Sequence, residues 1–162
     1  MITIRDKIAL GTFAGFIGSI PGLLVNFLSY QLGHSNYYSF QLAGGVYLLK
    51  NLTGSLSGII LGGIAWESMA GFLGILLVYL IHFTGRDYWW LKGIVISNGI
   101  FYILIYGFFF SLGGGPVGPK VVPWDIKTNY TVLLENLIFG LTTSYLIIKW
   151  NHTLGTKVRE LS

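Results

Sequence analysis

The chain contains no cysteine and few charged residues, and each shortage excludes a class of protein. Without cysteine it has no disulfide, no thiolate metal site and no cysteine nucleophile. Only 10% of its 162 residues are charged, against about 25% in soluble domains, and the length leaves no room for a separate soluble catalytic domain. The net charge of +4 comes from basic residues that flank apolar runs. That arrangement suits anionic lipid and argues against nucleic acid as a partner.

Long apolar runs make up most of the chain. With 53% hydrophobic residues, the sequence predicts an all-α, polytopic membrane protein that forms a single transmembrane domain over residues 1–162. A helix crosses a hydrocarbon core of about 30 Å with roughly 20 residues. Four runs reach that length, at about 8–30, 56–83, 91–112 and 130–150. Between the first two, the stretch 37–49 is too short to span, and we expect a short interfacial helix there.

The basic residues predict how the four spans are oriented. With four spans, both termini and the central connection share one side of the membrane, which then holds seven basic residues against three on the other. The positive-inside rule therefore predicts a protein of the cell membrane with both termini in the cytoplasm. The seven are Arg5, Lys7, Arg86, Lys92, Lys149, Lys157 and Arg159, and the three are Lys50, Lys120 and Lys127.

Glu67 is the only charged side chain in the 28-residue run 56–83. Ionisable residues inside a span usually mark an ion pathway, a ligand site or a structural pair. Four of the residues three, four or seven positions away on its helix are small, so we expect Glu67 to point at another helix near the middle of the membrane. Burial without a cation would favour the neutral carboxylic acid. These small residues are Gly63, Ala70, Gly71 and Gly74.

Glu135 is the second acidic residue within a span, and it lies about one and a half turns inside the outer end of the fourth run. Asn26 reaches a similar depth, and Asn98 lies in the inner third of the third run. Together with Glu67, these side chains form either a proton or cation route or a set of interhelical hydrogen bonds worth about 0.6 kcal/mol or more each. We favour the functional interpretation for Glu67 and the structural one for the other three.

Small residues predict where the helices pack closely. In the first run four glycines recur at spacings of 4, 3 and 4 residues, which places them on one helix face. A second set shares the face of Glu67, and a third stripe begins at Gly93. Pro21 removes one backbone hydrogen bond, which predicts a kink or hinge in the first span. The packing glycines are Gly11, Gly15, Gly18, Gly22, Gly63, Gly71, Gly74 and Gly93.

The sequence contains no recognisable pattern of an enzyme, a metal site or a nucleotide site. His34, His82 and His152 fall in different connections or at opposite membrane faces, without metal-ligand spacing. The connection 113–129 is rich in glycine and proline but lacks the Gly-Lys-Ser/Thr ending of a phosphate-binding loop. We therefore expect no catalytic residue, no metal and no cofactor. An intramembrane enzyme would need a substrate-sized cavity that opens at Glu67.

Six segments carry a pattern that extends over most of the chain. They are Asp6-Lys7-Ile8, Ile20-Pro21, 58–62, 71–74, 84–93 and 134–141. Together they resemble a group of small four-span bacterial integral membrane proteins of unassigned function. The resemblance implies a four-helix membrane protein with acidic positions in its second and fourth spans. Members of that group often carry a histidine after the second acidic residue, where this chain has Asn136, and this departure argues against a metal site there.

Two functions remain open from the sequence. The first is a small oligomeric transporter or channel that handles protons or cations through Glu67 and whose glycine stripes join subunits. The second is a structural or accessory membrane subunit without transport activity, whose polar groups only lock the helices together. The partners are the lipid bilayer and either a small ion or another membrane subunit.

Overall fold

The computed structural model describes residues 4–48, 50–106 and 126–151. α1 spans Lys7–Gln31, α2 spans Ser39–Gly44, the 3₁₀-helix η1 spans Lys50–Leu52, and α3 spans Leu56–Thr84. After a short turn, α4 spans Trp89–Ile94, η2 continues it as a π-helix over Val95–Tyr106, and α6 spans Ile126–Trp150. The described residues form no strand, which confirms the all-α prediction for this part of the chain.

Three of these helices, α1, α3 and α6, are long and apolar enough to cross a membrane. The bounds of α1 and α3 match the predicted spans 8–30 and 56–83 to within one residue, and α6 begins four residues before the predicted 130–150. The predicted span 91–112 is seen as α4 and η2 up to residue 106, and its remainder lies outside the described residues. The structure therefore supports a membrane protein with three candidate spans, and the fourth span stays a prediction.

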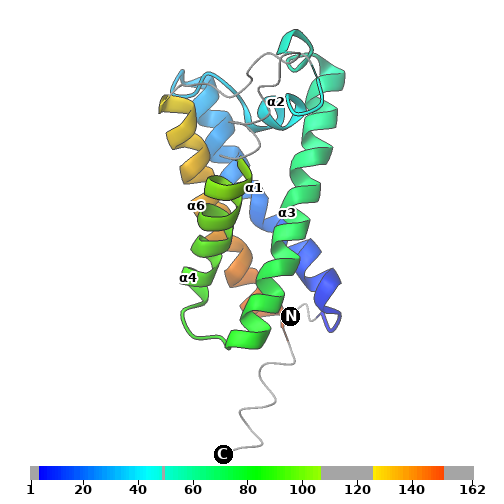
Figure 1. The fold of residues 1–162 in the computed structure, drawn as a ribbon, viewed down its shortest axis with the longest axis vertical. Helices are drawn as coiled ribbons and strands as arrows, with labels where there is room; N and C mark the ends of the chain where they lie inside the picture. The colour runs from blue at the N-terminus through cyan, green and yellow to red at the C-terminus, as the bar shows by residue number, and fades with distance from the viewer. Residues whose placement is uncertain (1–3, 49, 107–125, 152–162) are drawn as a thin grey trace, which may run out of the picture.

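The helices pack side by side in an elongated bundle (Figure 1). α1 packs against both α3 and α6, while α4 and η2 pack against α6. The two ends of the described chain meet at one end of the bundle, where the Ile4 N–H donates to the Trp150 carbonyl oxygen at 3.3 Å. α2 lies at the opposite end and packs on α3. Both ends of the described chain thus lie at the same end of the bundle. Their location in the cytoplasm stays a prediction, and so does the location of α2 at the membrane interface.

Side-chain caps and a glycine set the ends of the long helices. At the start of α1, Asp6 Oδ1 accepts a hydrogen bond from the Ala9 N–H at 2.6 Å. At the start of α3, Ser55 Oγ accepts one from the Gly58 N–H at 3.2 Å. Such caps satisfy backbone donors that have no partner inside the helix. α3 ends at Gly85, whose φ of 84° lies in the left-handed region that favours glycine.

Two basic residues cap the helix ends nearest the termini. Lys92 Nζ donates to the Gly85 carbonyl oxygen at 2.8 Å, just beyond the end of α3. Arg86 Nη2 donates to the carbonyl oxygens of Ile148 and Asn151, at 3.3 and 3.2 Å, at the end of α6. Carbonyl groups at a helix C-terminus carry partial negative charge and lack partners within the helix. These two residues, which the orientation prediction counts, therefore also stabilise the structure locally.

Glycines bring α1 into backbone contact with two neighbours. A Cβ on Gly11 would lie 2.5 Å from the Cα of Ile75 in α3, and one on Gly22 would lie 2.8 Å from the carbonyl oxygen of Glu135 in α6. The half of α1 near the termini therefore lies against α3, and its other half lies against α6. The glycines at the α1–α3 contact are Gly11, Gly15, Gly71 and Gly74, and those at the α1–α6 contact are Gly18 and Gly22.

The other packing glycines lie at further helix contacts. Gly93 in α4 faces Gly140 in α6, and a Cβ on either would collide with the carbonyl oxygen of the other. Gly63 in α3 faces the ring of Phe40 in α2, 3.2 Å from where its Cβ would be. α1 continues as one helix through Pro21. Because the stripe of α1 is occupied by helices of the same chain, any oligomer would have to use a different surface.

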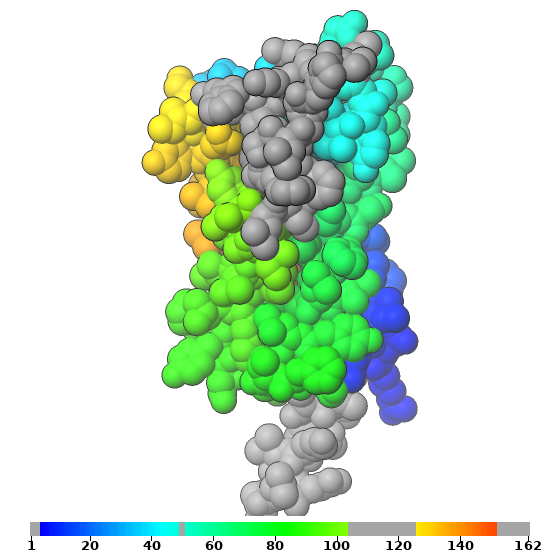
Figure 2. Space-filling view, in the orientation of Figure 1, coloured from blue at the N-terminus to red at the C-terminus, as the bar shows by residue number. Residues whose placement is uncertain are grey.

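Apolar residues divide between a buried core and an outer surface. Among the buried residues, Leu10 of α1 and Leu77 of α3 are each 1% exposed. The outward face of α1 is as apolar as the core, which suits contact with lipid tails. Figure 2 shows the side chains of α3 and α4 side by side over the lower half of one face of the molecule. The exposed apolar residues of α1 include Ile8, Phe13, Ile17, Ile20, Leu24 and Leu28.

Candidate functional site

Glu135 on α6 is the most deeply buried acidic side chain in the described part of the chain, with 1% of its surface exposed. It lies nine residues after Ile126, or roughly 14 Å along the helix at 1.5 Å per residue. Ser39 Oγ, at the start of α2, donates a hydrogen bond to Glu135 Oε2 at 2.5 Å. The other carboxyl oxygen, Oε1, is buried and makes no hydrogen bond of ordinary geometry with the described residues, and the Asn26 amide, whose Nδ2 is likewise buried without such a bond, lies within reach of the same carboxyl group. Glu135 is thus held on one side and unsatisfied on the other.

Asn26 on α1 holds the same serine. Its Oδ1 accepts a hydrogen bond from the backbone N–H of Ser39 at 3.1 Å, and both residues are fully buried. The connection between α1 and α3 therefore enters the bundle at Ser39 and joins α1 to α6. The sequence predicted that Asn26 and Glu135 lie at similar depth, and the structure joins them through a serine that the sequence analysis did not single out.

Glu67 on α3 is half-buried and contacts α1. The Ser19 Oγ lies 3.0 Å from Oε1 and 3.1 Å from Oε2 of Glu67, and it also lies 2.7 Å from the Phe16 carbonyl oxygen. A serine hydroxyl has one proton to donate and lone pairs to accept. It can therefore donate to an ionised Glu67, or accept from a protonated Glu67 while it donates to Phe16. The contact persists in both protonation states of the carboxyl group.

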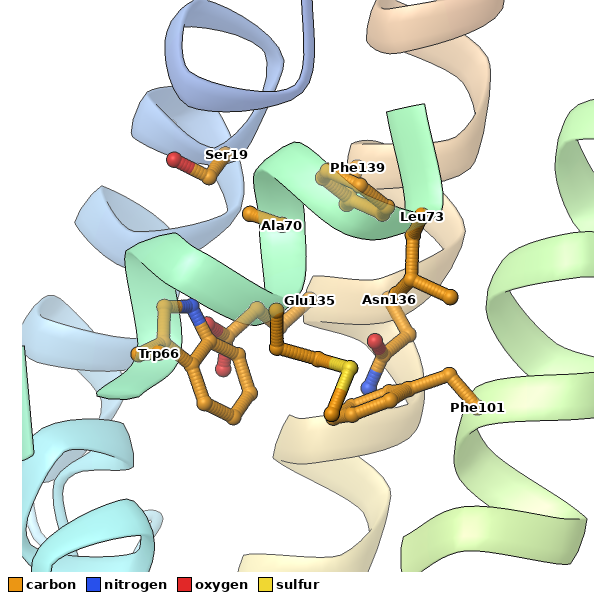
Figure 3. A pocket seen from close by; sticks show the side chains of 9 residues that line it. Ser19, Trp66, Ala70, Leu73, Phe101, Glu135, Asn136 and Phe139 are labelled. Carbon is orange, nitrogen blue, oxygen red and sulfur yellow. The ribbon is translucent and has the colours of Figure 1, made fainter. Parts of the chain in front are cut away.

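A small cavity lies between α3, α6 and η2, and Ser19 of α1 also lines it (Figure 3). About 20 Å³ of it is open to the centre of a water molecule, which is room for about one water. Glu135, Asn136 and Ser19 are the lining residues whose side chains carry oxygen. Since the Ser19 hydroxyl contacts Glu67, one residue of α1 touches both the cavity beside Glu135 and the second carboxyl group. The remaining lining residues are Trp66, Met69, Ala70, Leu73, Phe101 and Phe139.

Aromatic rings form much of the cavity wall. The rings of Trp66 on α3 and Phe101 on η2 meet edge to face, with centroids 5.7 Å apart and planes at 85°. Phe139 on α6 is 6% exposed and packs in the same core cluster. Edge-to-face pairs are a favourable arrangement because the positive edge of one ring meets the negative face of the other. The wall therefore presents a carboxyl group and several aromatic rings to the same small space.

A further group of aromatic rings lies where the connection between α1 and α3 enters the bundle. The ring of Tyr38 packs against Phe27 and Phe40, with centroid distances of 5.7 and 4.9 Å. Burial raises the pKa of the Tyr38 phenol above its ordinary value, and the negative charges of Glu135 and Glu67 raise it further. Both carboxyl groups are therefore within electrostatic reach of the same tyrosine, which places them in one region of the bundle.

Asn98 lies apart from this region. Its Nδ2 donates to Ser97 Oγ at 3.3 Å, and Ser97 lies at the contact between Gly93 and Gly140. None of the hydrogen bonds of the described residues joins Asn98 to Asn26, Glu67 or Glu135. Of the four side chains that the sequence predicted as an ion route, the structure brings three into one region and leaves Asn98 on η2, hydrogen-bonded to Ser97 beside the α4–α6 contact.

The sequence analysis missed Ser19, Ser39 and Trp66. Ser19 could have been found, because it lies between Gly15 and Gly22 on the small-residue face of α1. Ser39 could not, because no helix periodicity predicts where a connection enters a bundle. Trp66 is adjacent to Glu67 in the sequence, but a tryptophan in an apolar run is typical of any span or its interface.

The described residues hold no cluster of three or more histidine or acidic side chains that would suit a metal ion. His82 is exposed near the end of α3, and His34 is exposed at the opposite end of the bundle, while His152 lies outside the described residues. No basic side chain contributes to the environment of Glu67 or Glu135 in this part of the chain. Each carboxyl group is thus surrounded by hydroxyl, amide and apolar groups alone.

Compared with protein-family models, curated proteins and solved structures, the chain has no match. The resemblance to small four-span bacterial membrane proteins therefore remains an expectation from the sequence. What the protein does has to be argued from the bundle and its carboxyl groups.

Proposed function

We propose that the protein is a small multi-pass membrane protein of the transporter or channel class, in which Glu135 and Glu67 bind and release protons or monovalent cations. The observation that supports this most is the unpartnered Oε1 of Glu135, which belongs to a fully buried carboxyl group on the wall of a water-sized cavity. An isolated carboxylate in a low-dielectric interior costs several kcal/mol or more. A bound proton or cation removes that cost.

Ser19 is the connection between the two carboxyl groups. Ser19 lines the cavity beside Glu135, and its hydroxyl contacts Glu67 at 3.0 to 3.1 Å. A hydroxyl that donates to one group while it accepts from another can relay a proton, and a water in the cavity completes the path to Glu135. The proposal therefore places Glu135 as the buried binding group and Glu67 as the group nearer the protein surface.

Reconstitution into vesicles tests the proposal. Proteoliposomes with an internal pH indicator and an imposed potassium diffusion potential report proton flux, and outward gradients of sodium, potassium or ammonium report cation flux. We expect flux in the native protein, and loss of flux in Glu135→Gln and in Glu67→Gln, because an amide of the same shape binds no proton. Asp87→Asn is the matched control, since this exposed carboxyl group lies in the turn between α3 and α4.

The outcomes separate the proposal from its rival. The proposal fails if the native protein gives no flux of protons or of any of these cations, or if Glu135→Gln conducts as well as the native chain. Size-exclusion chromatography and circular dichroism of each variant show whether the fold is intact. A loss of flux in Asp87→Asn equal to that in Glu135→Gln also overturns it, because the effect would then not depend on the buried site.

The alternative, an accessory membrane subunit without transport activity, is favoured by the polar contacts that tie the helices together. Thr142 Oγ1 on α6 lies 3.1 Å from the Gly18 carbonyl oxygen on α1 and shares its one proton between this acceptor and the Ile138 carbonyl oxygen of its own helix, and Ser39 joins α1 to α6 through Asn26 and Glu135. Such hydrogen bonds stabilise membrane bundles by about 0.6 kcal/mol on average. Under this alternative the vesicles carry no flux, and Glu135→Ala lowers stability or assembly with a partner subunit.

A further inference from the structure

The cavity beside Glu135 combines features that select among monovalent cations. Glu135, which has one buried carboxyl oxygen without a hydrogen-bond partner among the described residues, lines it together with Asn136 and Ser19. The Asn136 Nδ2 already donates to the Val132 carbonyl oxygen at 2.8 Å, which leaves the acceptor end of this amide for a guest. Most of the remaining wall is aromatic or aliphatic. A guest would therefore meet one negative charge, a few acceptors and several ring systems.

Size excludes hydrated ions and larger organic substrates. About 20 Å³ is open to the centre of a water molecule, so the guest is of about the size of one water. Calcium ions take six to eight oxygen ligands, and channels that dehydrate potassium supply rings of carbonyl oxygens. The side chains of the lining supply oxygens from Glu135, Asn136 and Ser19, which is too few for a bare metal ion.

We propose that the cavity binds an ammonium ion. This inference rests on the proposed function, in that Glu135 binds a monovalent cation, and it names the class of that cation. Ammonium is close to water in size and has four N–H donors, so it requires acceptors in about four directions. Glu135, Asn136 and Ser19 provide three acceptor groups in the wall. The faces of aromatic rings attract cations that have lost their water, and Trp66 and Phe101 lie in the same wall.

The ion and the carboxylate also balance each other in charge. Ionised Glu135 and ammonium form a neutral pair, in which the ion donates to the Oε1 that has no other partner among the described residues. Ser39 continues to donate to Oε2. With ammonium bound, both oxygens of a carboxyl group that is 1% exposed therefore have a hydrogen-bond donor. Protonation of one oxygen alone would neutralise the charge but would add no donor from a neighbouring group.

Thermal unfolding of the purified full-length protein in detergent tests the inference. A ligand that binds only the folded state raises the unfolding temperature as its concentration rises. The titrations use ammonium, potassium, sodium and tetramethylammonium chlorides at constant ionic strength and constant pH. We expect a saturable rise with ammonium, at least about tenfold weaker apparent affinity for potassium and sodium, and no effect of tetramethylammonium, since one charge-assisted hydrogen bond corresponds to about a tenfold change or more.

Three variants assign the effect to the cavity. Glu135→Gln removes the charge and should weaken ammonium binding at least about tenfold. Trp66→Leu removes one ring from the wall and should weaken it about fivefold while the carboxyl group stays. Trp90→Phe is the matched control, because Trp90 is 45% exposed on α4 and lies outside the cavity wall. It should bind ammonium as the native protein does. If Glu135→Gln does not fold, Trp66→Leu alone carries the test.

The inference and the proposed function fail in different ways. If proton flux in vesicles depends on Glu135 but no salt gives a saturable ammonium response, the inference is overturned and the function stands. If flux and ammonium binding are both absent, both are overturned. An equal response to potassium, a response to tetramethylammonium, or a response that survives in both Glu135→Gln and Trp66→Leu also overturns the inference, because each contradicts the size, the charge or the place of the site.

Discussion

The two buried carboxyl groups of this protein have contrasting surroundings. Glu135 on α6 is 1% exposed, is held by Ser39 and keeps one oxygen without a partner among the described residues. Glu67 on α3 is half-buried, and both of its oxygens lie near one hydroxyl of α1. Both belong to long apolar helices that are candidate membrane spans. The difference teaches that the burial of a charged side chain depends more on which segment covers it than on how far it lies from the end of its helix.

The covering segment explains the contrast. α2 and the residues before it enter the bundle beside α6 and bring Ser39, Tyr38 and their neighbours over Glu135. Glu67 lies at the edge of the α1–α3 contact, where glycines let two backbones approach. Close backbone packing leaves no room for a carboxyl group within the contact itself. The same small residues that predicted an inward direction for Glu67 therefore also keep it at the rim.

The largest expected effect is a difference in chemical labelling between the two ends of the bundle, which should be complete at one end and absent at the other. The chain has no native cysteine, so a single introduced cysteine reports one position. His34→Cys lies at the end near α2, and Asp87→Cys lies at the end near the termini, and both native side chains are exposed. We expect a membrane-impermeant maleimide added to intact cells to label the first fully and the second not at all. Labelling of both cysteines from outside intact cells would contradict the prediction that the two ends of the bundle lie on opposite sides of the membrane.

A side chain at Gly22 should break the contact beside Glu135. Its Cβ would lie 2.8 Å from the Glu135 carbonyl oxygen and 3.1 Å from the Glu135 Cγ, so Gly22→Leu forces α1 and α6 apart. We expect the free energy of unfolding to fall by about 3 kcal/mol, at the upper end of overpacking effects. The measurement is equilibrium unfolding of the protein in mild detergent micelles as a denaturing detergent is added in increasing amounts. Gly99→Ala is the control, because its nearest neighbour, a methyl carbon of Val95, would be 3.9 Å away. A native stability for Gly22→Leu would refute the close contact.

Removal of each carboxyl group should have unequal effects on stability. Glu135→Ala leaves the buried Ser39 hydroxyl without its acceptor and opens a void, and we expect it to cost about 2 kcal/mol. Glu67→Ala, at a half-buried site, should cost about 1 kcal/mol or less. Glu135→Gln retains an acceptor for Ser39 and should stay within about 1 kcal/mol of the native protein. The contrast between the two sites disappears if both alanine variants unfold at the same denaturant concentration.

The smallest effect should come from Ser19, one of the two serines beside the carboxyl groups. Ser39→Ala removes the donor to Glu135 and should cost about 1.5 kcal/mol, while Ser19→Ala should cost about 0.5 kcal/mol, since a net hydrogen bond contributes about 1 kcal/mol and more when its partner is buried. The same unfolding assay measures both. Ser68→Ala is a control, because its exposed hydroxyl bonds only to the Ile64 carbonyl oxygen of its own helix. A larger loss of stability in Ser19→Ala than in Ser39→Ala would contradict the conclusion that α2 covers and holds Glu135.

Several features of the fold could be predicted from residue patterns alone. The apolar runs predicted α1 and α3 to within a residue, because a membrane core requires a fixed length of helix with its backbone hydrogen-bonded internally. The spacing of Gly11 and Gly15 predicted the face on which helices meet, because that spacing is the helical period. It did not predict that this face would be shared between α3 and α6.

The candidate site was only partly predictable. The two acidic residues and Asn26 stood out because polar side chains are rare in apolar runs. Their relative importance did not follow, because a helix wheel gives a direction but no neighbour. Glu67 has small residues on its own helix face and Glu135 has threonines, yet Glu135 is the more buried of the two. Ser39 and the ring of Trp66 entered the site only through contacts between distant segments.

The sequence by itself determined the helical class of the described residues, the bounds of α1 and α3, the length and apolar character that suit a membrane, and the rarity of charge inside these helices, because these depend on length, period and the cost of polar groups in lipid. Only the tertiary structure decided which carboxyl group is sealed in. That outcome depends on where the connection after α1 re-enters the bundle and on the cavity left between α3, α6 and η2. Neither is set by local periodicity, since both arise from packing between residues far apart in the chain.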